Sequence, residues 1–454
     1  MQSKNLNIIG AGLVGSLLSI YLAKRGHKVN VFERRPDIRK NRISAGKSIN
    51  LALSDRGWKG LEGVGIADEI KKVGIPMKGR LIHTQDGKTN FQAYGKDGQA
   101  IYSVSRGGLN CVLMDLAEKS GVTFHFNEKC TGIDLAAGSS HFENTETKKQ
   151  TTGQADHTFG TDGAFSAVRL QIQLSTDRFD YKQSYLEYGY KELRIPPVPR
   201  TLQNPSGEFA LEQHALHIWP RGNFMLIALP NMDKSFTCTL FFPFEGKPSF
   251  TELNTEEKML HFFEATFPDA VRLMPTLAKD YFSNPSSSLV TVKCFPWSYQ
   301  DKFLLMGDAA HAIVPFYGQG MNCGFEDCVV LNQLMDKHSD DMKSVFAAFE
   351  TTRKPNSDAI ADLAVANFVE MRDRVSDPKF ILQKKIETLF SQKYPDKWIP
   401  LYSMVTYSPH IPYSIALKEG EKQEAIMQKI LALPGIERNW DSAEVEAEIL
   451  KYLK

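Results

Sequence analysis

The first forty residues alternate between apolar runs and polar turns in a way that predicts a strand, a helix and a second strand. Residues 6–9 (LNII) form a short apolar run, and a glycine-rich turn follows at residues 10–15 (GAGLVG). Residues 16–26 place apolar side chains at helical spacing and end at a glycine, and residues 28–33 (KVNVFE) alternate like a strand. The opening of the chain therefore predicts a βαβ unit, the start of a parallel sheet covered by helices.

The middle of the chain is rich in predicted strands. Apolar residues alternate with turn residues between positions 79 and 103, which predicts hairpins, and the polar segment 137–157 is predicted to be an exposed hairpin or loop. Helical spacing favours helices at residues 107–121 and 255–267. The remaining predicted strands occupy residues 122–126, 215–220, 224–230, 235–244 and 302–306. From a helix that begins near residue 321 onward, the chain is predicted to be mostly helical.

Composition narrows the class of protein. Of the 454 residues, 42% are hydrophobic and 24% are charged, which is typical of a globular protein with two or three domains. The net charge of +1 argues against nucleic acid as a partner. The six cysteines are scattered without a CxxC pair, which favours reduced thiols and a cytoplasmic location.

The best candidate for a membrane span is the stretch 398–417, which has no charged residue if His410 is neutral. Prolines at positions 400, 409 and 412 interrupt it, and a lipid-exposed helix tolerates such breaks poorly. The apolar N-terminal stretch contains three glycines and lacks a convincing cleavage site, so export is not expected. Because the tail after residue 417 is charged and amphipathic, we expect no stable membrane anchor.

The turn at residues 10–15 carries a dinucleotide-binding fingerprint. Gly10 permits the tight turn, Gly12 lets a pyrophosphate approach the backbone, and Gly15 lets the helix pack closely on the strand. Glu33, at the end of the second strand, suits a ribose hydroxyl and repels a 2′-phosphate, which favours FAD or NAD over NADP. One alternative is a turn with a purely structural role, which binds no dinucleotide. The other is an NADP site, indicated by the two arginines after Glu33, but arginines after a strand are more typical of a solvent-exposed edge of the sheet.

A second motif follows the apolar run at residues 302–306. Gly307 lets the backbone come close to a ligand there, and Asp308 can accept a hydrogen bond from a ribityl hydroxyl. The loop near the flavin ring consists of Pro315, Phe316, Gly318, Gln319 and Gly320. It opens a helix near Met321 and Asn322, whose N-terminal dipole favours the anionic end of a reduced flavin. Because NAD has no ribityl chain, the two motifs together select FAD; Asp308 by itself is equally consistent with a simple turn.

A third motif is Asp162-Gly163, followed by a helix start and Arg169. With these three motifs the chain resembles the single-component, FAD-dependent aromatic hydroxylases, the class A flavin monooxygenases. Longer segments, including YSVSRGGLN at 102–110 and GDAAHAIVPFYGQGMNCGFEDC at 307–328, resemble the members that hydroxylate L-kynurenine. The resemblance extends from residue 1 to about residue 408.

The resemblance implies tightly bound FAD, NADPH as a transient reductant without a Rossmann domain of its own, and O2. It implies hydroxylation of L-kynurenine next to the ring amine, a step of tryptophan degradation. The chemistry is the cofactor's, so no side chain is assigned a certain catalytic role, and no metal is implied. The implied substrate-binding residues are Arg80, Tyr94, Asn367 and Tyr402. The further implied cofactor-binding residues are Leu13, Arg34, Arg106, Asp162, Gly320, Met321 and Asn322.

The residue types agree with such a substrate, because Arg80 offers a planar fork for a carboxylate and the tyrosine hydroxyls can complete its hydrogen bonding. Taken alone, an arginine beside a predicted strand is more often a surface residue. His311 is expected to be a satisfied structural histidine rather than a catalytic one.

The order of elements predicts an α/β fold whose domains are discontinuous in sequence. The expected Rossmann-like FAD-binding domain comprises residues 1–75, 97–175 and 290–350, the substrate-binding β-sheet domain comprises 76–96 and 176–289, and a helical region covers 351–454.

Three departures and two alternatives accompany the resemblance. Tyr317 and Cys323 stand where Phe and Ala are expected, and Thr161 is atypical before the Asp-Gly pair. Eukaryotic members carry a hydrophobic C-terminal anchor, whereas the charged tail here favours a soluble, bacterial-type form. The alternatives are another class A hydroxylase or flavin oxidoreductase acting on a related aromatic amino acid, and a non-catalytic binding protein of the same fold. The sequence leaves open whether the chain forms a homodimer.

Overall fold

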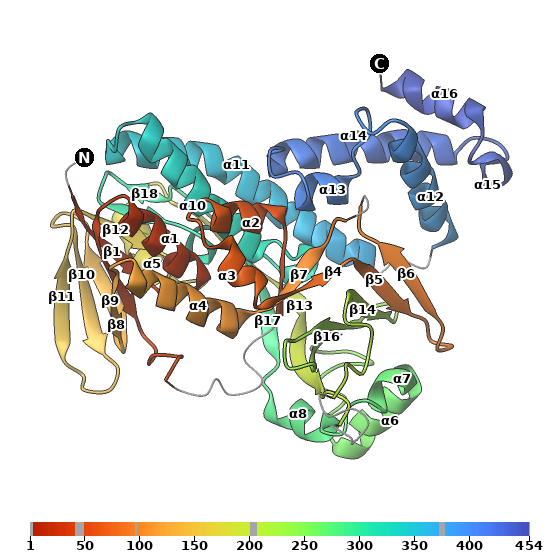
Figure 1. Ribbon diagram of the computed structural model, residues 1–454, viewed down its shortest axis with the longest axis horizontal. Helices are drawn as coiled ribbons and strands as arrows, with labels where there is room; N and C mark the ends of the chain where they lie inside the picture. The colour runs from red at the N-terminus through yellow and green to blue at the C-terminus, as the bar shows by residue number, and fades with distance from the viewer. Residues whose placement is uncertain (1–2, 41–49, 96–97, 200–206, 372–376, 454) are drawn as a thin grey trace.

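The computed structural model describes residues 3–40, 50–95, 98–199, 207–371 and 377–453. In Figure 1 the N-terminal α/β elements lie at the left, a large sheet lies below the centre, and the C-terminal helices lie at the upper right.

A six-stranded sheet, in the order β18-β19-β12-β1-β2-β8, contains the predicted βαβ unit. Its strands are β1 Asn5–Ile9, β2 Lys28–Glu33, β8 Thr123–Phe126, β12 His157–Gly160, β18 Ser298–Tyr299 and β19 Phe303–Leu305. All neighbours run parallel except the pair β18–β19. The parallel strands are apolar because helices cover them, and the predicted strands at 6–9, 28–33, 122–126 and 302–306 are thereby confirmed.

Helices from distant parts of the chain share the core of this sheet. They are α1 Leu13–Lys24, α4 Arg106–Lys119, α5 Ala167–Ser175, α10 Gly320–Lys337 and the start of α11 Met342–Val369. The polar segment 137–157 forms the hairpin of β10 Ser139–Asn144 and β11 Gln150–Gln154, which pairs with β9 Glu128–Asp134 at the left edge of Figure 1. This confirms the prediction of a hairpin there.

The expected run of hairpins between residues 79 and 103 is only partly correct. Strands β5 Gly79–His83 and β6 Thr89–Ala93 do form an antiparallel hairpin. The next strand, β7 Ile101–Ser105, pairs instead with β3 Asn50–Leu53 and β4 Gly74–Met77 in a separate small sheet. Turn residues mark where a strand ends, but the partner of the next strand is decided by long-range packing.

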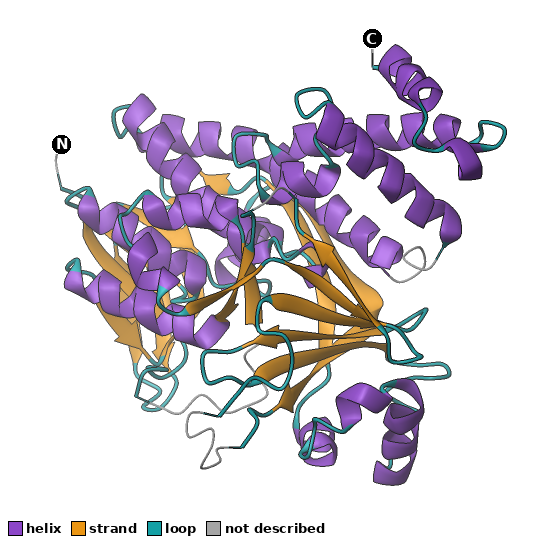
Figure 2. Cartoon of the chain, turned by 45° about the vertical axis from the view of Figure 1, so that its right-hand side comes forward, coloured by secondary structure: helices purple, strands orange, loops and turns teal. Residues whose placement is uncertain are grey.

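The largest sheet has seven strands, in the order β17-β13-β16-β15-β14-β5-β6. Its further strands are β13 Asp180–Ile195, β14 Ala215–Pro220, β15 Met225–Pro230, β16 Phe236–Pro243 and β17 Ser287–Phe295. One face packs on α6 Glu256–Thr266, α7 Pro268–Val271 and α8 Leu277–Ser283. The other face packs on α11 and the C-terminal helices, so Figure 2 shows the sheet between two groups of helices. Alternate residues serve opposite faces, as Leu240 and Phe242 do relative to Phe241.

The C-terminal region is helical, as predicted. It contains α12 Pro378–Lys393, α13 Leu401–Thr406, α14 Tyr413–Leu431, α15 Ile436–Asn439 and α16 Ala443–Tyr452. The uncharged stretch 398–417 is divided between α13, a loop and the start of α14, and Trp398, Val405 and Tyr413 are buried within it. Among the described helices, none is both long and apolar enough to cross a membrane.

Candidate active site

The glycine fingerprint forms a cradle at the start of α1. Gly10 has φ of +104°, and a Cβ atom there would lie 2.6 Å from the Thr161 carbonyl oxygen. A Cβ on Gly15 would collide with the Gly10 carbonyl oxygen and come within 2.6 Å of Thr161 Oγ1. At Gly12 no described atom lies within 4 Å of the added Cβ. Two glycines thus pack backbone on backbone, and the third faces open space at a helix start that no described side chain caps.

The acid of the fingerprint lies beside this turn. Glu33 Oε2 accepts a hydrogen bond from the Ala11 N–H at 3.0 Å, and Oε1 accepts one from the Arg35 N–H at 3.0 Å. Leu13 is the first residue of α1, and the side chain of Arg34 is exposed just beyond β2. Arg106, the first residue of α4, is also exposed. Asn110 of the same helix donates a hydrogen bond from its side chain to the Ala11 carbonyl oxygen at 2.9 Å. Glu33 and Asn110 therefore lie against the cradle, at the edge of the sheet where β1 and β2 end.

The Gly-Asp motif meets the fingerprint at Val14. Gly307 has φ of +57° and lies close to the side chain of Val14. A Cβ atom added to Gly307 would lie 3.0 Å from a methyl carbon of Val14. The Gly307 N–H donates to Asp327 Oδ2 at 3.0 Å, so a side chain of α10 holds the turn at Gly307 in place. Asp308 is exposed and begins the short helix α9 Asp308–His311. Two motifs separated by nearly three hundred residues therefore converge, as the choice of FAD requires.

Asp162 has a structural role that the sequence did not indicate. Its carboxylate accepts hydrogen bonds from Ser166 Oγ at 2.5 Å and from the Ala167 N–H at 2.7 Å, at the start of α5. Burial raises the pKa of Asp162, although these hydrogen bonds oppose the shift. Arg169 donates to the Ala309 carbonyl oxygen at 2.8 Å and so links α5 to α9. The segment after Asp162-Gly163 thus supports the segment after Gly307-Asp308. A contact of Asp162 with the cofactor stays a prediction.

The loop before α10 is held from three directions. Pro315–Tyr317 forms a single 3₁₀ turn, Gly318 ends it with φ of +67°, and Gln319 precedes α10. Asn322 uses its side chain fully, donating to the Ala52 and Gly318 carbonyl oxygens at 2.8 Å and accepting from the Ser54 N–H at 2.9 Å. In the described chain no side chain caps α10, and its first turn has no acid. Its backbone N–H groups therefore remain available to an anionic partner.

Arg80, Tyr94 and Tyr402 come together, as the sequence predicts. The Arg80 guanidinium lies 5.5 Å from the ring centre of Tyr94 and 4.9 Å from that of Tyr402, and the two rings stack 5.5 Å apart. Arg80 lies on β5, Tyr94 follows β6, and Tyr402 lies on α13. Burial alone lowers the pKa of Arg80, but the neighbouring Tyr94 and Tyr402 hydroxyls raise it, so the guanidinium stays charged.

Three polar atoms in this cluster are buried without a hydrogen-bond partner in the described chain: Arg80 Nε, Tyr94 Oη and Tyr407 Oη. Tyr407 was not predicted; its ring lies 6.2 Å from that of Tyr402, and its side chain shares a buried cluster with Tyr94. Burial raises the pKa of both Tyr94 and Tyr407, so each hydroxyl keeps its proton and acts as a donor. Unpaired buried donors are costly, and an anionic acceptor is the kind of ligand that suits donors of this type.

Asn367 lies beside the flavin loop. It is buried on α11, and its Nδ2 donates to the Phe316 carbonyl oxygen at 2.7 Å. Tyr317, the next residue of that loop, stacks on Tyr402 with ring centres 5.8 Å apart. The structure thus connects Asn367 to the flavin loop and connects that loop to the arginine cluster. A direct contact of Asn367 with substrate stays a prediction.

His311 is an ion-paired structural residue, as expected. Its Nε2 lies 2.7 Å from Asp327 Oδ2, and Asp327 Oδ1 accepts from Arg353 Nε at 2.7 Å. Burial alone lowers the pKa of His311, but Asp327 raises it well above the ordinary value. His311, Asp327 and Cys323 have the spacing of a metal site. However, Arg353 already forms an ion pair with Asp327 and donates a hydrogen bond to the Cys323 sulfur at 3.2 Å, so two of the three possible ligands already have partners within the protein.

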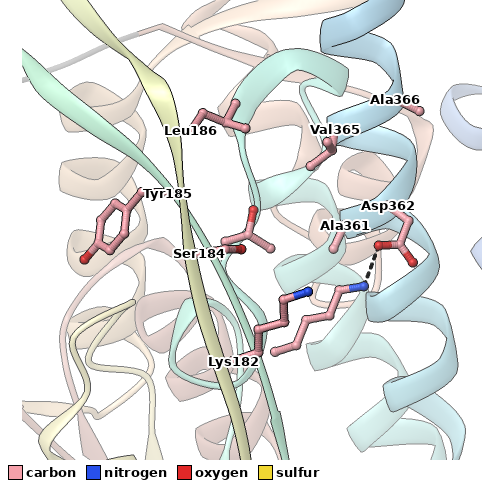
Figure 3. Close-up of a pocket in the computed structure, with 10 residues that line it drawn as sticks. Lys182, Ser184, Tyr185, Leu186, Ala361, Asp362, Val365 and Ala366 are labelled. Carbon is pink, nitrogen blue, oxygen red and sulfur yellow. Dashed lines mark hydrogen bonds and ion pairs between the residues drawn. The ribbon is translucent and has the colours of Figure 1, made fainter. Parts of the chain in front are cut away.

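A cavity of about 410 Å³ lies apart from these residues, between β13, β17 and α11 (Figure 3). Lys182 and Ser184 reach into it from the sheet, and Lys293 pairs with Asp362 of α11 at 2.5 Å. It shares no lining residue with the Arg80 cluster. The candidate active site is therefore defined by the convergence of the motifs and not by this cavity.

Comparison with known proteins agrees with this geometry. The family profile described as FAD binding domain matches residues 3–364. Kynurenine 3-monooxygenase of Flavobacterium johnsoniae is 52% identical over 452 residues, which cover 100% of this chain and 99% of that protein. The enzyme of the same name from Dictyostelium discoideum is 47% identical, covering 95% of this chain and 94% of that protein.

Solved structures share the fold at lower identity. The tetrameric form of 2-methyl-3-hydroxypyridine-5-carboxylic acid oxygenase has a TM-score of 0.66 at 21% identity, covering 83% of this chain and 95% of that one. P. aeruginosa PqsL in complex with 2-aminobenzoylacetate has a TM-score of 0.62 at 17% identity, covering 82% and 98%. With relatives of this identity along its full length, the chain belongs to the kynurenine 3-monooxygenase family of FAD-dependent monooxygenases.

Proposed function

We propose that this enzyme uses NADPH and O2 to hydroxylate L-kynurenine to 3-hydroxy-L-kynurenine. The observation that carries the choice of substrate is the set of unpaired buried donors on Arg80, Tyr94 and Tyr407. L-Kynurenine has an α-carboxylate that these donors would bind, and its aromatic ring would suit the tyrosine rings that stack beside them. A charge-assisted contact with a carboxylate is among the stronger hydrogen bonds in proteins.

FAD is the cofactor of this family, and the residues present fit it. We propose that Gly12 and the start of α1 hold the pyrophosphate, that Glu33 holds the adenosine ribose, and that Asp308 holds the ribityl chain. The loop from Pro315 to Gly320 and the uncapped start of α10 would face the flavin ring. When bound and reduced, the flavin supplies the activation of oxygen.

The protein contributes a dry, fixed setting for the aromatic ring. Phe316 packs against Phe241 at 4.8 Å and against Phe368 at 4.3 Å between ring centres. These rings are buried beside the flavin loop and exclude water from it. The amine of the substrate already activates the ortho carbon, so no strong general base is demanded of the chain. We propose that the rings hold the substrate and that the Arg80 cluster holds its carboxylate.

We also propose the domain division given by the sequence and a cytoplasmic location. All six cysteines lie in the described ranges as free thiols, five of them buried, which supports a reducing compartment.

The direct test supplies the purified protein with L-kynurenine, NADPH and isotopically labelled O2 and follows products by mass spectrometry. We expect one labelled oxygen atom in the product and release of FAD, not FMN, on denaturation. Formation of hydrogen peroxide with unchanged kynurenine would favour the oxidase alternative. A colourless, folded protein would favour the non-catalytic alternative.

A further inference from the structure

Helix α13 forms a wall of the proposed substrate site but cannot be stable by itself. It has six residues, Leu401–Thr406, and carries Tyr402; Tyr407 follows at its C-terminal end. Isolated helices this short do not form in water, because nucleation costs more than a few hydrogen bonds return. The carbonyl groups of its last turn also need partners from outside the helix. The group that donates hydrogen bonds to these carbonyl oxygens therefore also determines the positions of Tyr402 and Tyr407.

Arg56, on α2 Asp55–Glu62, supplies those partners. Its Nε donates to the Val405 carbonyl oxygen at 2.7 Å. Its Nη2 donates to the carbonyl oxygens of Met404 at 3.2 Å, Ser408 at 3.3 Å and Ile411 at 2.5 Å. The side chain is fully buried, and four of its acceptors belong to the segment 404–411. A cation at a helix C-terminus is also favoured by the helix dipole.

The same guanidinium is tied to the cofactor side of the molecule. Its Nη1 pairs with Glu326 at 2.6 Å, and Glu326 pairs with Arg353 at 2.5 Å. Arg353 pairs in turn with Asp327, which accepts the Gly307 N–H of the Gly-Asp motif. One buried series of ion pairs therefore runs from the substrate wall to the turn proposed to hold the ribityl chain.

A second connection runs through an aromatic ring. The Arg56 guanidinium lies 3.9 Å from the ring centre of Tyr413, whose hydroxyl donates to Gln319 Oε1 at 2.9 Å. Gln319 belongs to the flavin loop. Arg56 thus contacts, directly or through one residue, both the helix with Tyr402 and the loop before α10.

We propose that Arg56 is a positioning residue for substrate binding, which sets the place of Tyr402 and Tyr407 relative to the flavin loop. The inference rests on the proposed function, because it takes α13 as a wall of the kynurenine site. Arg56 does not touch the cluster of Arg80 and Tyr94, so its effect is transmitted through the backbone of 404–411. Most of its hydrogen bonds go to that segment, so its loss should impair substrate binding more than FAD binding.

The test uses the full chain with Arg56→Lys, which keeps the charge for Glu326 but loses the planar fork that spans five acceptors. We expect normal FAD content and a KM for L-kynurenine raised about 10-fold or more, with a smaller change in kcat. Uncoupled formation of hydrogen peroxide should increase. Hydrogen exchange in residues 401–411 should quicken, while exchange in α10 changes less.

The matched control is Arg25→Lys. Arg25 pairs with Asp336, near the end of α10, at 2.6 Å and with Asp340, beyond the end of that helix, at 3.0 Å, and its side chain is also largely buried. This variant should lose some stability but leave KM for kynurenine and exchange in α13 unchanged. An equal rise in KM in both variants would show that general stability, not position, is responsible.

Three results would overturn the proposal for Arg56. One is an Arg56→Lys protein with wild-type KM and exchange. Another is failure of Arg56→Lys to fold or a parallel loss of FAD, which would make Arg56 a general scaffold residue. The third is slower turnover without a change in KM. If wild-type protein does not turn over kynurenine, the proposed function fails separately, and the exchange experiment still decides whether Arg56 holds α13.

Discussion

At the scale of single residues, Arg80 offers the clearest test of the substrate site, because its charge lies against two tyrosine rings and its Nε is unpaired in the described chain. Arg80→Ala should raise the dissociation constant for L-kynurenine and leave FAD content unchanged. Loss of a desolvated, charge-assisted contact costs about 2–4 kcal/mol, which corresponds to roughly 30- to 1000-fold in affinity. Titration of the flavin spectrum with kynurenine measures it, and Arg80→Lys should restore binding only in part.

Decarboxylated kynurenine is the control for Arg80. Because it lacks the group that Arg80 is expected to bind, wild type and Arg80→Ala should bind it about equally. If Arg80→Ala still prefers kynurenine over this compound as strongly as wild type does, the carboxylate is bound elsewhere.

Tyr407 provides a second residue-scale prediction. Tyr407→Phe removes a buried, unpaired hydroxyl, so the ligand-free protein should lose no stability, while KM for kynurenine should rise about 10-fold if the hydroxyl donates to the carboxylate. Tyr281→Phe is the matched control, since it removes another unpaired buried hydroxyl in the core behind the seven-stranded sheet. Steady-state kinetics of both variants decide the matter. A wild-type KM for Tyr407→Phe would remove Tyr407 from the substrate site.

At the scale of elements, the turn into α1 separates cofactor binding from folding. Gly12→Val places its side chain in open space, where the pyrophosphate is proposed to lie, so the protein should fold without FAD. Gly15→Val should instead disrupt the packing of α1 on β1, because Thr161 and the Gly10 carbonyl already occupy that space. Flavin absorbance and circular dichroism of the two purified variants distinguish these effects. A yellow Gly12→Val protein would contradict the proposed place of the cofactor.

At the scale of the whole molecule, the buried pair of His311 and Asp327 predicts how stability depends on pH. Because the folded protein raises the pKa of His311, the ion pair contributes its full stability at pH values below 6.5, the ordinary pKa of histidine. This contribution is lost as the pH rises through the pKa of His311 in the folded protein. Burial alone would raise the pKa of Asp327, but His311 and Arg353 lower it. The contribution of Asp327 to stability is therefore present above pH 3.8 and is lost as the pH falls through its pKa in the folded protein. Both contributions are therefore complete between about pH 4 and pH 6.5.

The variant His311→Gln tests this behaviour. The difference in free energy of unfolding between wild type and His311→Gln should be largest near pH 6. It should shrink toward alkaline pH by about 1.4 kcal/mol for each pH unit until His311 titrates in the folded protein. Thermal unfolding of the FAD-bound proteins across this range measures it. A difference that does not change between pH 6 and pH 9 would mean that His311 is neutral in the fold.

The sequence by itself determined the features that depend on neighbouring residues. The strand–turn–helix–strand order at the N-terminus, the hairpin at 137–157 and the start of α10 follow from periodicity and turn chemistry over a few positions. The two cofactor motifs were also predictable, because each is a short stretch whose glycines and acid carry their own geometric reason. Arg80, Tyr94 and Tyr402 were implied by the resemblance and not by any local pattern, and the structure brings them together.

Only the tertiary structure decided which distant residues meet. It assigned β7 to a separate sheet, connected Asn367 to the flavin loop, and added Tyr407 to the arginine cluster. The hydrogen bond from Arg56 to Val405 spans 349 positions of the chain, and no local pattern announces it. An arginine beside an acid in a helix reads as a surface residue until packing removes it from water. Its partners are then fixed by the strong tendency of buried donors and carbonyls to pair, and that tendency acts through space and not along the sequence.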